Sequence, residues 1–354
     1  MIRYRNRKAL QLESDTVRVT VLVEGGHIAE ILHKPSGVNP LWTPPWNSIE
    51  PSEWSFAEHP EYGPGADARL LAGIMGHNLC MDLFGGPSDE EAAAGMTAHG
   101  EASDAPFELT SRDGVLTAKA SFPQAQLRFE RSIRFLSPNV IQITESVENL
   151  KTWDGPIAWT QHVTLGPPFL VPGITQFRAS ATRSKVYDSD FAAGKGFMEI
   201  GAEFTWPHAP APGGQGTVDR RTLLDRPATG GYSTHLMDPA RKRAFFMAWS
   251  PVSKTLIGYV WNQSDFPWLG IWDENCSRTA PPWNGVAVAR GMEFGVSPMP
   301  ETRRAMIARG SLFGVPGFLW IPAKKTLRVD YRAFITGADS IPEQPPAEAL
   351  AGWQ

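Results

Sequence analysis

The sequence has little that would place the protein in a membrane, on nucleic acid or in an oxidising compartment. Its two cysteines, Cys80 and Cys276, lie far apart and are too few for a disulfide framework or a thiolate zinc site. No stretch approaches the ~18 consecutive apolar residues of a membrane span. No basic run occurs and the formal net charge is −4, so we expect neither nucleic acid nor a membrane as a partner.

Several familiar signatures are also missing. The first residues, MIRYRNRKALQLESD, carry positive charge without a following apolar segment, so we expect no signal peptide and a cytoplasmic protein. The sequence contains no P-loop, no Rossmann glycine fingerprint, no G-x-S-x-G and no H-E-x-x-H motif. Nothing in the sequence indicates the oligomeric state.

The chain is instead rich in residues that favour strands and turns. It has 33 Gly and 31 Pro, which punctuate turns and resist helix formation. Asp113-Gly114 lies between two alternating runs and predicts a hairpin. Only two short helices are predicted, one from Ser88, where Ser88 and Glu91 form a capping-box pair, and one over 300–310. Strands are predicted over 17–23, 127–135, 140–149, 244–250, 255–261 and 327–335.

This pattern predicts an all-β fold, because no β-α-β rhythm is present. Many strands with long connections are typical of an antiparallel β-sandwich or barrel. The length of 354 residues would ordinarily suggest two domains, but a large sandwich can hold the whole chain. We therefore expect a single domain over 1–354, with a Pro-rich tail at about 341–354 that wraps the domain or frays.

Three polar positions stand out as candidates for chemistry. His99 is followed by Gly100 and Glu101, His162 lies in a strand-like run, and Glu293 lies between glycines in an otherwise apolar run. Each has an ordinary explanation, because a loop histidine is often only exposed and a strand histidine can be a hydrogen-bonded core residue. A strand glutamate can likewise face solvent.

The order of these positions resembles that of galactose mutarotases and the wider aldose 1-epimerase-like group. Each motif is weak alone, but together they run in the family's order from about residue 15 to about residue 335. The motifs that carry the resemblance are GGHIAEI (25–31), GIMGHNLCMDLFGGPS (73–88), HGE (99–101), TQHVTLG (160–166), PWLGIWDEN (267–275) and GMEFGVSPMP (291–300).

The resemblance implies a large galactose mutarotase-like β-sandwich with a few short helices, acting on a small-molecule sugar. It implies an isomerase that interconverts sugar anomers, with Glu293 as general base and His162 as general acid. His99 would bind a ring hydroxyl or the ring oxygen. Such a reaction needs no metal and no cofactor.

Other substrate-binding residues are expected from the places where the chain departs from the family. His77 and Asn78 stand where the family usually has an arginine, and Ser233 stands where it has an aspartate, so that His235 or Asp238 would substitute. Trp272 would offer a flat apolar face to the sugar, and Asp273 would bind hydroxyls or form a polar turn. Trp159, Trp268 and Trp283 are further candidates for this face or for the core.

Two other functions stay open at this point. A sugar-binding protein could keep the cleft without turnover. A lyase or hydrolase could use the same sandwich, and hydrolysis would need two carboxylates, for which Glu101 and Glu293 are candidates. Phosphosugars would need cationic clamps, and Arg290, Arg303 and Arg304 are near the glutamate only in sequence.

Overall fold

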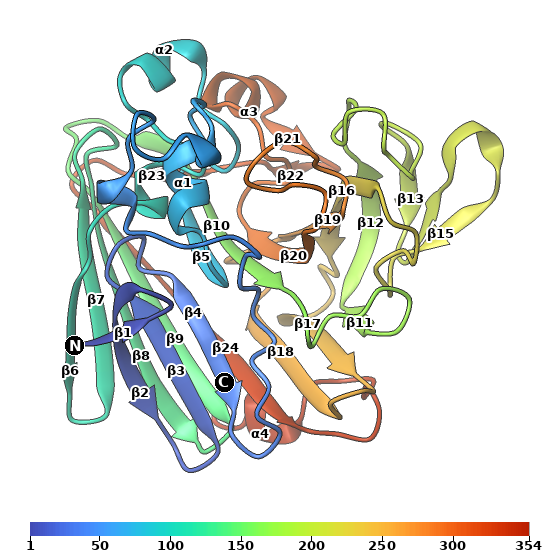
Figure 1. The fold of residues 1–354 in the computed structure, drawn as a ribbon, viewed down its shortest axis with the longest axis horizontal. Coiled ribbons are helices and arrows are strands. Elements are labelled where there is room, and N and C mark those ends of the chain that lie inside the picture. The colour runs from blue at the N-terminus through green and yellow to red at the C-terminus, as the bar shows by residue number, and fades with distance from the viewer. Residues whose placement is uncertain (354) are drawn as a thin grey trace.

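Two large antiparallel sheets make up most of the protein in a computed structural model that describes residues 1–353 (Figure 1). The all-β sandwich predicted from the sequence is confirmed. The first sheet has 12 strands. In spatial order they are β1 (Ile2–Tyr4), β2 (Arg7–Glu13), β3 (Val17–Leu22), β4 (Ile28–His33), β5 (His77–Asp82), β10 (Gly155–Leu165), β20 (Val288–Gly295), β19 (Trp268–Asn275), β16 (Thr229–Met237), β12 (Ala181–Val186) and β13 (Glu203–Thr205), with β23 (Leu319–Ile321) pairing with the start of β10.

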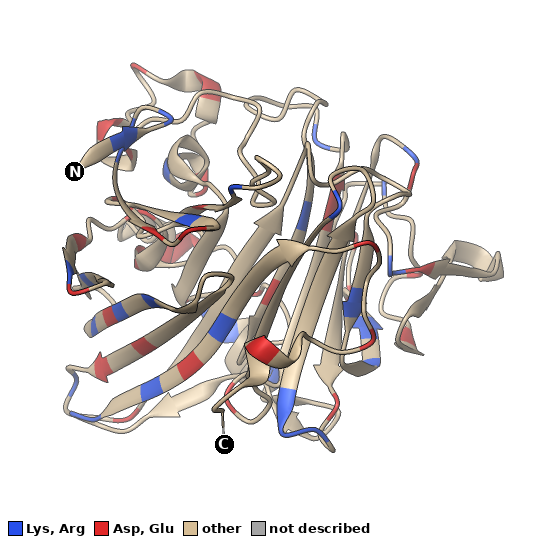
Figure 2. Ribbon diagram, turned by 90° about the horizontal axis from the view of Figure 1, so that it is seen from below, with Lys and Arg blue, Asp and Glu red and all other residues tan. Residues whose placement is uncertain are grey.

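The second sheet has eight strands and covers one face of the first. Its order is β11 (Gln176–Ala179), β17 (Arg243–Ser250), β18 (Thr255–Asn262), β24 (Thr326–Gly337), β9 (Val140–Asn149), β8 (Leu127–Ser137), β7 (Val115–Phe122) and β6 (Glu108–Arg112). Figure 2 shows basic and acidic residues close together on these strands, as in the ion pairs Arg128–Glu148 and Lys119–Glu130.

Small elements complete the chain. Two short hairpins pair β14 (His208–Pro210) with β15 (Thr217–Asp219) and β21 (Ser311–Leu312) with β22 (Val315–Pro316). The helices are α1 (Ala68–Gly73), α2 (Asp89–Ala93), α3 (Arg303–Arg309) and α4 (Ala347–Leu350), with 3₁₀ turns η1 (Pro51–Glu53), η2 (Pro60–Tyr62), η3 (Glu101–Ser103) and η4 (Pro212–Gly214). Among the described residues, none of these helices has the length and apolar character to cross a membrane.

The local signals in the sequence act as expected. Asp113 and Gly114 both adopt positive φ, 51° and 76°, and join β6 to β7. Ser88 caps α2 and forms both bonds of the capping box with Glu91. Thr302 caps α3, which ends at Gly310. The sequence patterns predicted neither α1 nor α4.

The main core lies between the two sheets. Trp261 of β18 stacks on Phe294 of β20, with ring centroids 4.3 Å apart. A fully buried ion pair, Arg131–Glu145, lies in the same layer, where Gln161 and Tyr331 also donate hydrogen bonds to Glu145. Every second side chain of β10 and β20 therefore packs into this core, and the side chains between them face the other side of the first sheet.

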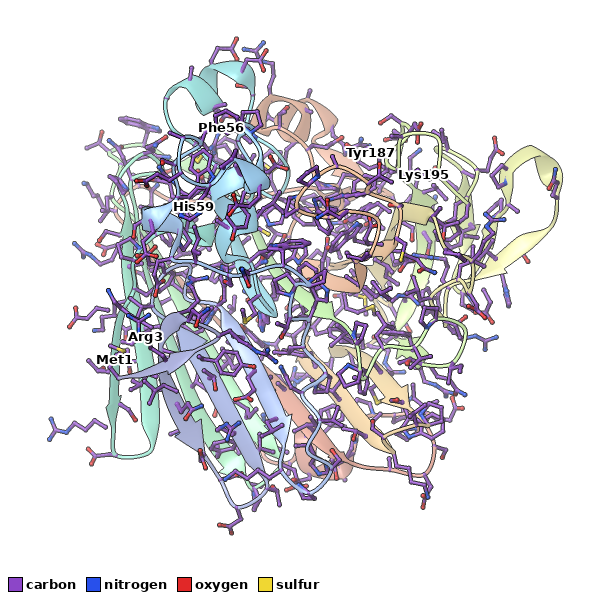
Figure 3. All side chains as sticks on the ribbon, viewed as in Figure 1. Met1, Arg3, Phe56, His59, Tyr187 and Lys195 are labelled. Atoms are coloured by element: carbon purple, nitrogen blue, oxygen red, sulfur yellow. The ribbon has the colours of Figure 1, made fainter. Side chains whose placement is uncertain are left out.

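That opposite face of the first sheet is covered by α1 and by long connecting segments. A second cluster of buried apolar residues forms there and includes Trp42, Leu70, Phe84, Tyr232 and Trp272. Figure 3 labels residues on two of these segments, Phe56 and His59 on the stretch before α1 and Tyr187 and Lys195 on the stretch after β12.

The Pro-rich tail packs against the second sheet through residue 353. Arg332 of β24 donates hydrogen bonds to the carbonyl oxygens of Ala349 and Ala351, at 3.0 and 2.8 Å. Its guanidinium also lies over the Trp353 ring. Gln354, the last residue of the predicted tail, lies outside the described residues.

Candidate active site on the outer face of the first sheet

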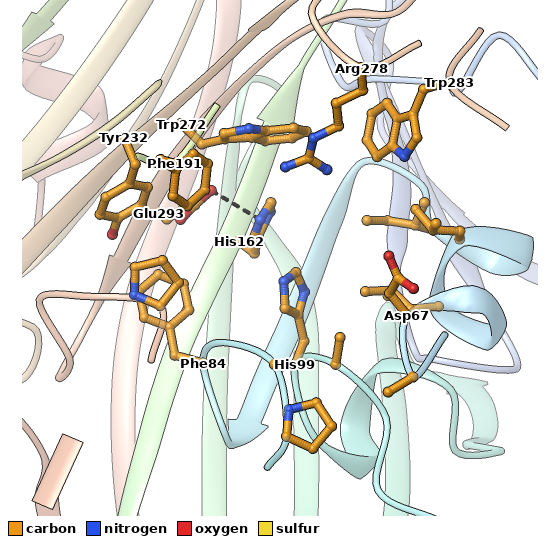
Figure 4. Close-up of a pocket in the computed structure, with 18 residues that line it drawn as sticks. Asp67, Phe84, His99, His162, Phe191, Tyr232, Trp272, Arg278, Trp283 and Glu293 are labelled. Carbon is orange, nitrogen blue, oxygen red and sulfur yellow. Dashed lines mark ion pairs between the residues drawn. The ribbon is translucent and has the colours of Figure 1, made fainter. Parts of the chain in front are cut away.

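The register between β10 and β20 places Glu293 beside His162. The two residues are direct partners in the ladder, and a carboxylate oxygen of Glu293 lies 3.0 Å from His162 Nε2 (Figure 4). Both side chains are almost fully buried, with exposed fractions of 2% and 6%. Because an ionised carboxylate only accepts hydrogen bonds, Nε2 carries the hydrogen in this contact.

The other nitrogen of the same imidazole is also held. His162 Nδ1 lies 3.0 Å from the Thr164 hydroxyl oxygen, two residues further along β10 and on the same face. A hydroxyl can accept a hydrogen bond from a protonated Nδ1 or donate one to a neutral Nδ1. Thr164 can therefore orient the ring in either charge state.

Gly291 leaves room for the carboxylate of Glu293, and Gly270 leaves room for the hydroxyl of Tyr232. A Cβ atom on Gly291 would overlap the carboxylate oxygen of Glu293, and a Cβ atom on Gly270, its partner on β19, would overlap the Tyr232 hydroxyl. Glu293 is therefore not a solvated strand residue. Its carboxylate occupies space that a side chain at position 291 would fill.

His99 reaches the same place from the loop between α2 and η3. Its φ is 67°, and its backbone exchanges hydrogen bonds with Gly85 and Met81, which hold the loop against β5. The ring centroid lies 4.8 Å from that of His162, and Nδ1 has no hydrogen-bond partner among residues 1–353. Burial, with a contribution from the nearby His162, holds the pKa of His99 well below its usual range, so the ring is neutral at pH 7.

These three residues line a cavity of about 400 Å³. Its wall is largely aromatic, and the Trp272 ring lies 6.0 Å from the imidazole of His162 and 6.0 Å from the Trp283 ring. Asp67 and Arg278 add two charged groups, and Figure 4 shows Asp67 opposite Glu293 and the Arg278 guanidinium beside Trp272. The other lining residues are Ala66, Leu70, Leu71, Ile74, Phe84, Gly86, Pro87, Ala98, Phe191, Tyr232 and Pro300.

The structure thus brings together His99, His162, Trp272 and Glu293 of the residues singled out in the sequence. Asn78 lies next to His162 on β5 and on the same face, but it is fully buried and does not line the cavity. Its amide nitrogen has no hydrogen-bond partner among residues 1–353.

Three other predicted ligands lie away from the cavity, because alternation turns them into the core between the sheets. His77 contacts Gln161 and Tyr259, at 3.0 and 3.3 Å. His235 lies between the hydroxyls of Ser184 and Ser233. Asp273 forms buried ion pairs with Arg220 and Arg290. Trp159 and Trp268 are also fully buried, whereas Trp283 lines the cavity with Trp272.

The second carboxylate considered for hydrolysis also lies elsewhere. Glu101 does not line the cavity, and its oxygens accept hydrogen bonds from the backbone N–H groups of Gln124 and Ala125. Of the nearby arginines, Arg303 is held by Asp82 and Glu91, and Arg290 by Asp273. No group of three or more His, Cys, Asp or Glu side chains within residues 1–353 is arranged to hold a metal ion.

Sequence reasoning missed Asp67, Phe84, Phe191, Tyr232 and Arg278. Asp67, Phe84, Phe191 and Arg278 lie on connecting segments, so no periodic pattern marks them. Two of them had a local signal: Phe84 lies within the 73–88 motif, and Arg278 follows the turn after β19.

No family model and no curated protein matches the sequence. Solved structures match its fold. The chain has the galactose mutarotase-like fold. A Klebsiella pneumoniae protein provisionally named as an aldose 1-epimerase aligns over 99% of this chain and 84% of its own, with a TM-score of 0.69 and 13% identity. A similarly named Escherichia coli K12 protein aligns over 93% and 99%, with a TM-score of 0.63 and 11% identity.

A third structure is a galactose mutarotase-like protein from Lactobacillus casei. It aligns over 93% of this chain and all of its own, with a TM-score of 0.58 and 14% identity. Identities this low show the fold alone.

Proposed function

We propose that the protein interconverts the α and β anomers of an aldose, with Glu293 as general base and His162 as general acid. One observation supports this most strongly: a carboxylate and an imidazole lie 3.0 Å apart on the wall of an aromatic cavity. In a pyranose, the C1 hydroxyl oxygen and the ring oxygen are both bonded to C1. An acid and a base that must act on these two neighbouring oxygens have to be neighbours themselves.

The reaction balances within this pair when His162 starts as the imidazolium, with a hydrogen on each ring nitrogen, and becomes a neutral imidazole in the open-chain state. Glu293 takes the proton of the C1 hydroxyl, the bond between C1 and the ring oxygen breaks, and the ring oxygen takes the proton from His162 Nε2. C1 is then an aldehyde carbon. After rotation about the C1–C2 bond, the same two groups return their protons in reverse as the ring closes on the other face, and both residues recover their starting states.

The remaining cavity residues would position the sugar. Trp272 and Trp283 offer flat apolar surfaces for the C–H face of a pyranose. His99 is neutral and has an unpartnered ring nitrogen, so it can bond a sugar hydroxyl. Ring opening already proceeds in water, and positioning with one acid and one base is enough to accelerate it.

Polarimetry with freshly dissolved α-anomers of common aldoses tests this function. We expect the rotation to reach equilibrium faster with the protein than in buffer alone, for at least one aldose. Glu101→Gln is the matched control, because Glu101 lies outside the cavity, and it should keep the activity. Saturable sugar binding without any acceleration would instead show a sugar-binding protein, and depolymerisation of a polysaccharide would support the lyase or hydrolase.

A further inference from the structure

Two charged side chains on the cavity wall have hydrogen-bonding groups that no other residue within 1–353 uses. Arg278 is the only Lys or Arg that lines this cavity in the described chain, and Asp67 lies across from the Glu293 side (Figure 4). Neither group takes part in the proton transfers proposed above. A carboxylate without a partner among residues 1–353 and a guanidinium whose terminal nitrogens make no hydrogen bond there are groups that a polar ligand could satisfy.

The Arg278 guanidinium is held in place by aromatic rings. Its central carbon lies 4.6 Å from the Trp283 ring centroid and 5.3 Å from that of Trp272. Within residues 1–353 its only ion pair is a 3.5 Å contact from Nε to Glu274.

Glu274 is already engaged, because its carboxylate accepts hydrogen bonds from the Ser277 hydroxyl and from the backbone N–H of Arg278. The two terminal nitrogens of Arg278 make no hydrogen bond within residues 1–353. They are therefore oriented but free to donate.

Asp67 directly precedes α1, yet its side chain does not cap that helix. The carboxylate makes no hydrogen bond and no ion pair among the described residues, and the residue is exposed at the cavity rim. It can therefore accept hydrogen bonds from a molecule in the cavity.

The charge balance indicates which sugars fit. A phosphate group needs a surplus of positive charge, but Arg278 is accompanied in the cavity by two carboxylates, Asp67 and Glu293. Of the other arginines considered, Arg290 is paired with Asp273, Arg303 is paired with Asp82 and Glu91, and Arg304 is exposed outside the cavity. A neutral sugar meets no such repulsion, and two adjacent hydroxyls match one acceptor and one forked donor.

We propose that Arg278 and Asp67 bind neighbouring hydroxyls of an unphosphorylated aldose, at the end of the ring away from C1, and select it over sugar phosphates. This inference rests on the anomer exchange proposed above. The pair comes from two connecting segments, not from the strands that carry the acid and the base. Specificity and chemistry are thus supplied by separate parts of the chain.

Steady-state kinetics with Arg278→Gln and Asp67→Asn test the proposal. For a neutral aldose that the wild type converts, each variant should raise KM by about tenfold or more, because a hydrogen bond to a charged group is lost. The value of kcat should change by less than about threefold. Arg304→Gln and Asp15→Asn remove the same charges from exposed positions outside the cavity and should leave KM unchanged.

Deoxy sugars locate the contact. A deoxy analogue that lacks one of the recognised hydroxyls should bind the wild type weakly, and Arg278→Gln or Asp67→Asn should weaken it little further. The corresponding 6-phosphate should be a poorer ligand than the free aldose. Unchanged KM in both variants, or tighter binding of the phosphate, would overturn the proposal.

Binding measured by calorimetry on Glu293→Gln separates this proposal from the anomer exchange. Sugar binding that depends on Arg278 and Asp67 without any exchange in the wild type would remove the enzymatic function and keep the recognition pair. Anomer exchange that is unchanged in both Arg278→Gln and Asp67→Asn would keep the enzymatic function and remove the recognition pair.

Discussion

The Glu293 carboxylate faces the His162 imidazole at 3.0 Å because the two residues are direct partners in the ladder between β10 and β20. The contact does not depend on a flexible loop. Thr164 holds the far side of the imidazole, and Gly291 leaves the space that the carboxylate occupies. The acid and base are thus placed by backbone hydrogen bonds of the sheet, which is a rigid way to build a catalytic pair.

Replacing His162 by Asn should lower kcat by about 10²–10⁴-fold, because the amide can donate a hydrogen bond but cannot give up a proton as an acid. KM should stay within about threefold of the wild type, since the side chain keeps a donor near the sugar. Initial rates over a range of aldose concentrations separate the two constants. A raised KM with unchanged kcat would make His162 a binding residue only.

Gly291→Ala should lower kcat by about tenfold or more without unfolding the protein. The new Cβ atom would overlap the Glu293 carboxylate, which is the movable end of its side chain, so the carboxylate has to shift away from His162. Gly155→Ala is the control, because a Cβ there meets only ordinary contacts. Thermal melts and rates measured together check the prediction, and full activity in Gly291→Ala would contradict it.

The protein should lose stability as the pH falls from 7 to 5. Burial lowers the pKa of His27 to about 3 and holds those of His77 and His235 well below the usual range. Below about pH 6.5 the unfolded chain therefore binds protons that the folded protein does not, and the free energy of unfolding falls by up to about 1.4 kcal/mol per pH unit for each histidine. Asp104, whose pKa burial raises to about 6, opposes this, as do Glu101 and Asp265, whose pKa values burial also raises.

Urea unfolding at pH 7 and pH 5 measures this change. His27→Gln should reduce the pH dependence, because an amide does not titrate between pH 5 and 7. The amide can still donate a hydrogen bond to the Ser103 carbonyl oxygen, which lies 3.0 Å from His27 Nε2 in the wild type. Equal stability at both pH values in the wild type would show that these histidines do not stay neutral in the folded protein.

The strands could be predicted from the sequence because their signals are local. Alternation in 140–149 corresponds to β9 with the same bounds, and Asp113-Gly114 supplies the positive φ values that its hairpin needs. α1 was missed because six residues are too few to show a helical period. The sheet order could not be predicted, because partners such as β5 and β10 are joined by no local pattern.

The candidate site was only partly predictable for the same reason. His162 and Glu293 lie in strands whose register a single sequence does not reveal, and their meeting was inferred from the order of family motifs. The motifs near His77, His235 and Asp273 do not indicate which face of its strand each side chain takes, and all three face the core. Asp67 and Arg278 lie on segments that only the folded chain brings to one cavity.

Glu293→Gln tests the central claim most directly, because it removes the base and keeps the shape of the side chain. Anomer exchange is measured by NMR magnetisation transfer, and sugar binding is measured by titration of the same sample. We predict that protein-dependent exchange falls by at least about 10²-fold while the dissociation constant stays within about threefold. Exchange as fast as in the wild type would contradict the assignment of Glu293 as the base.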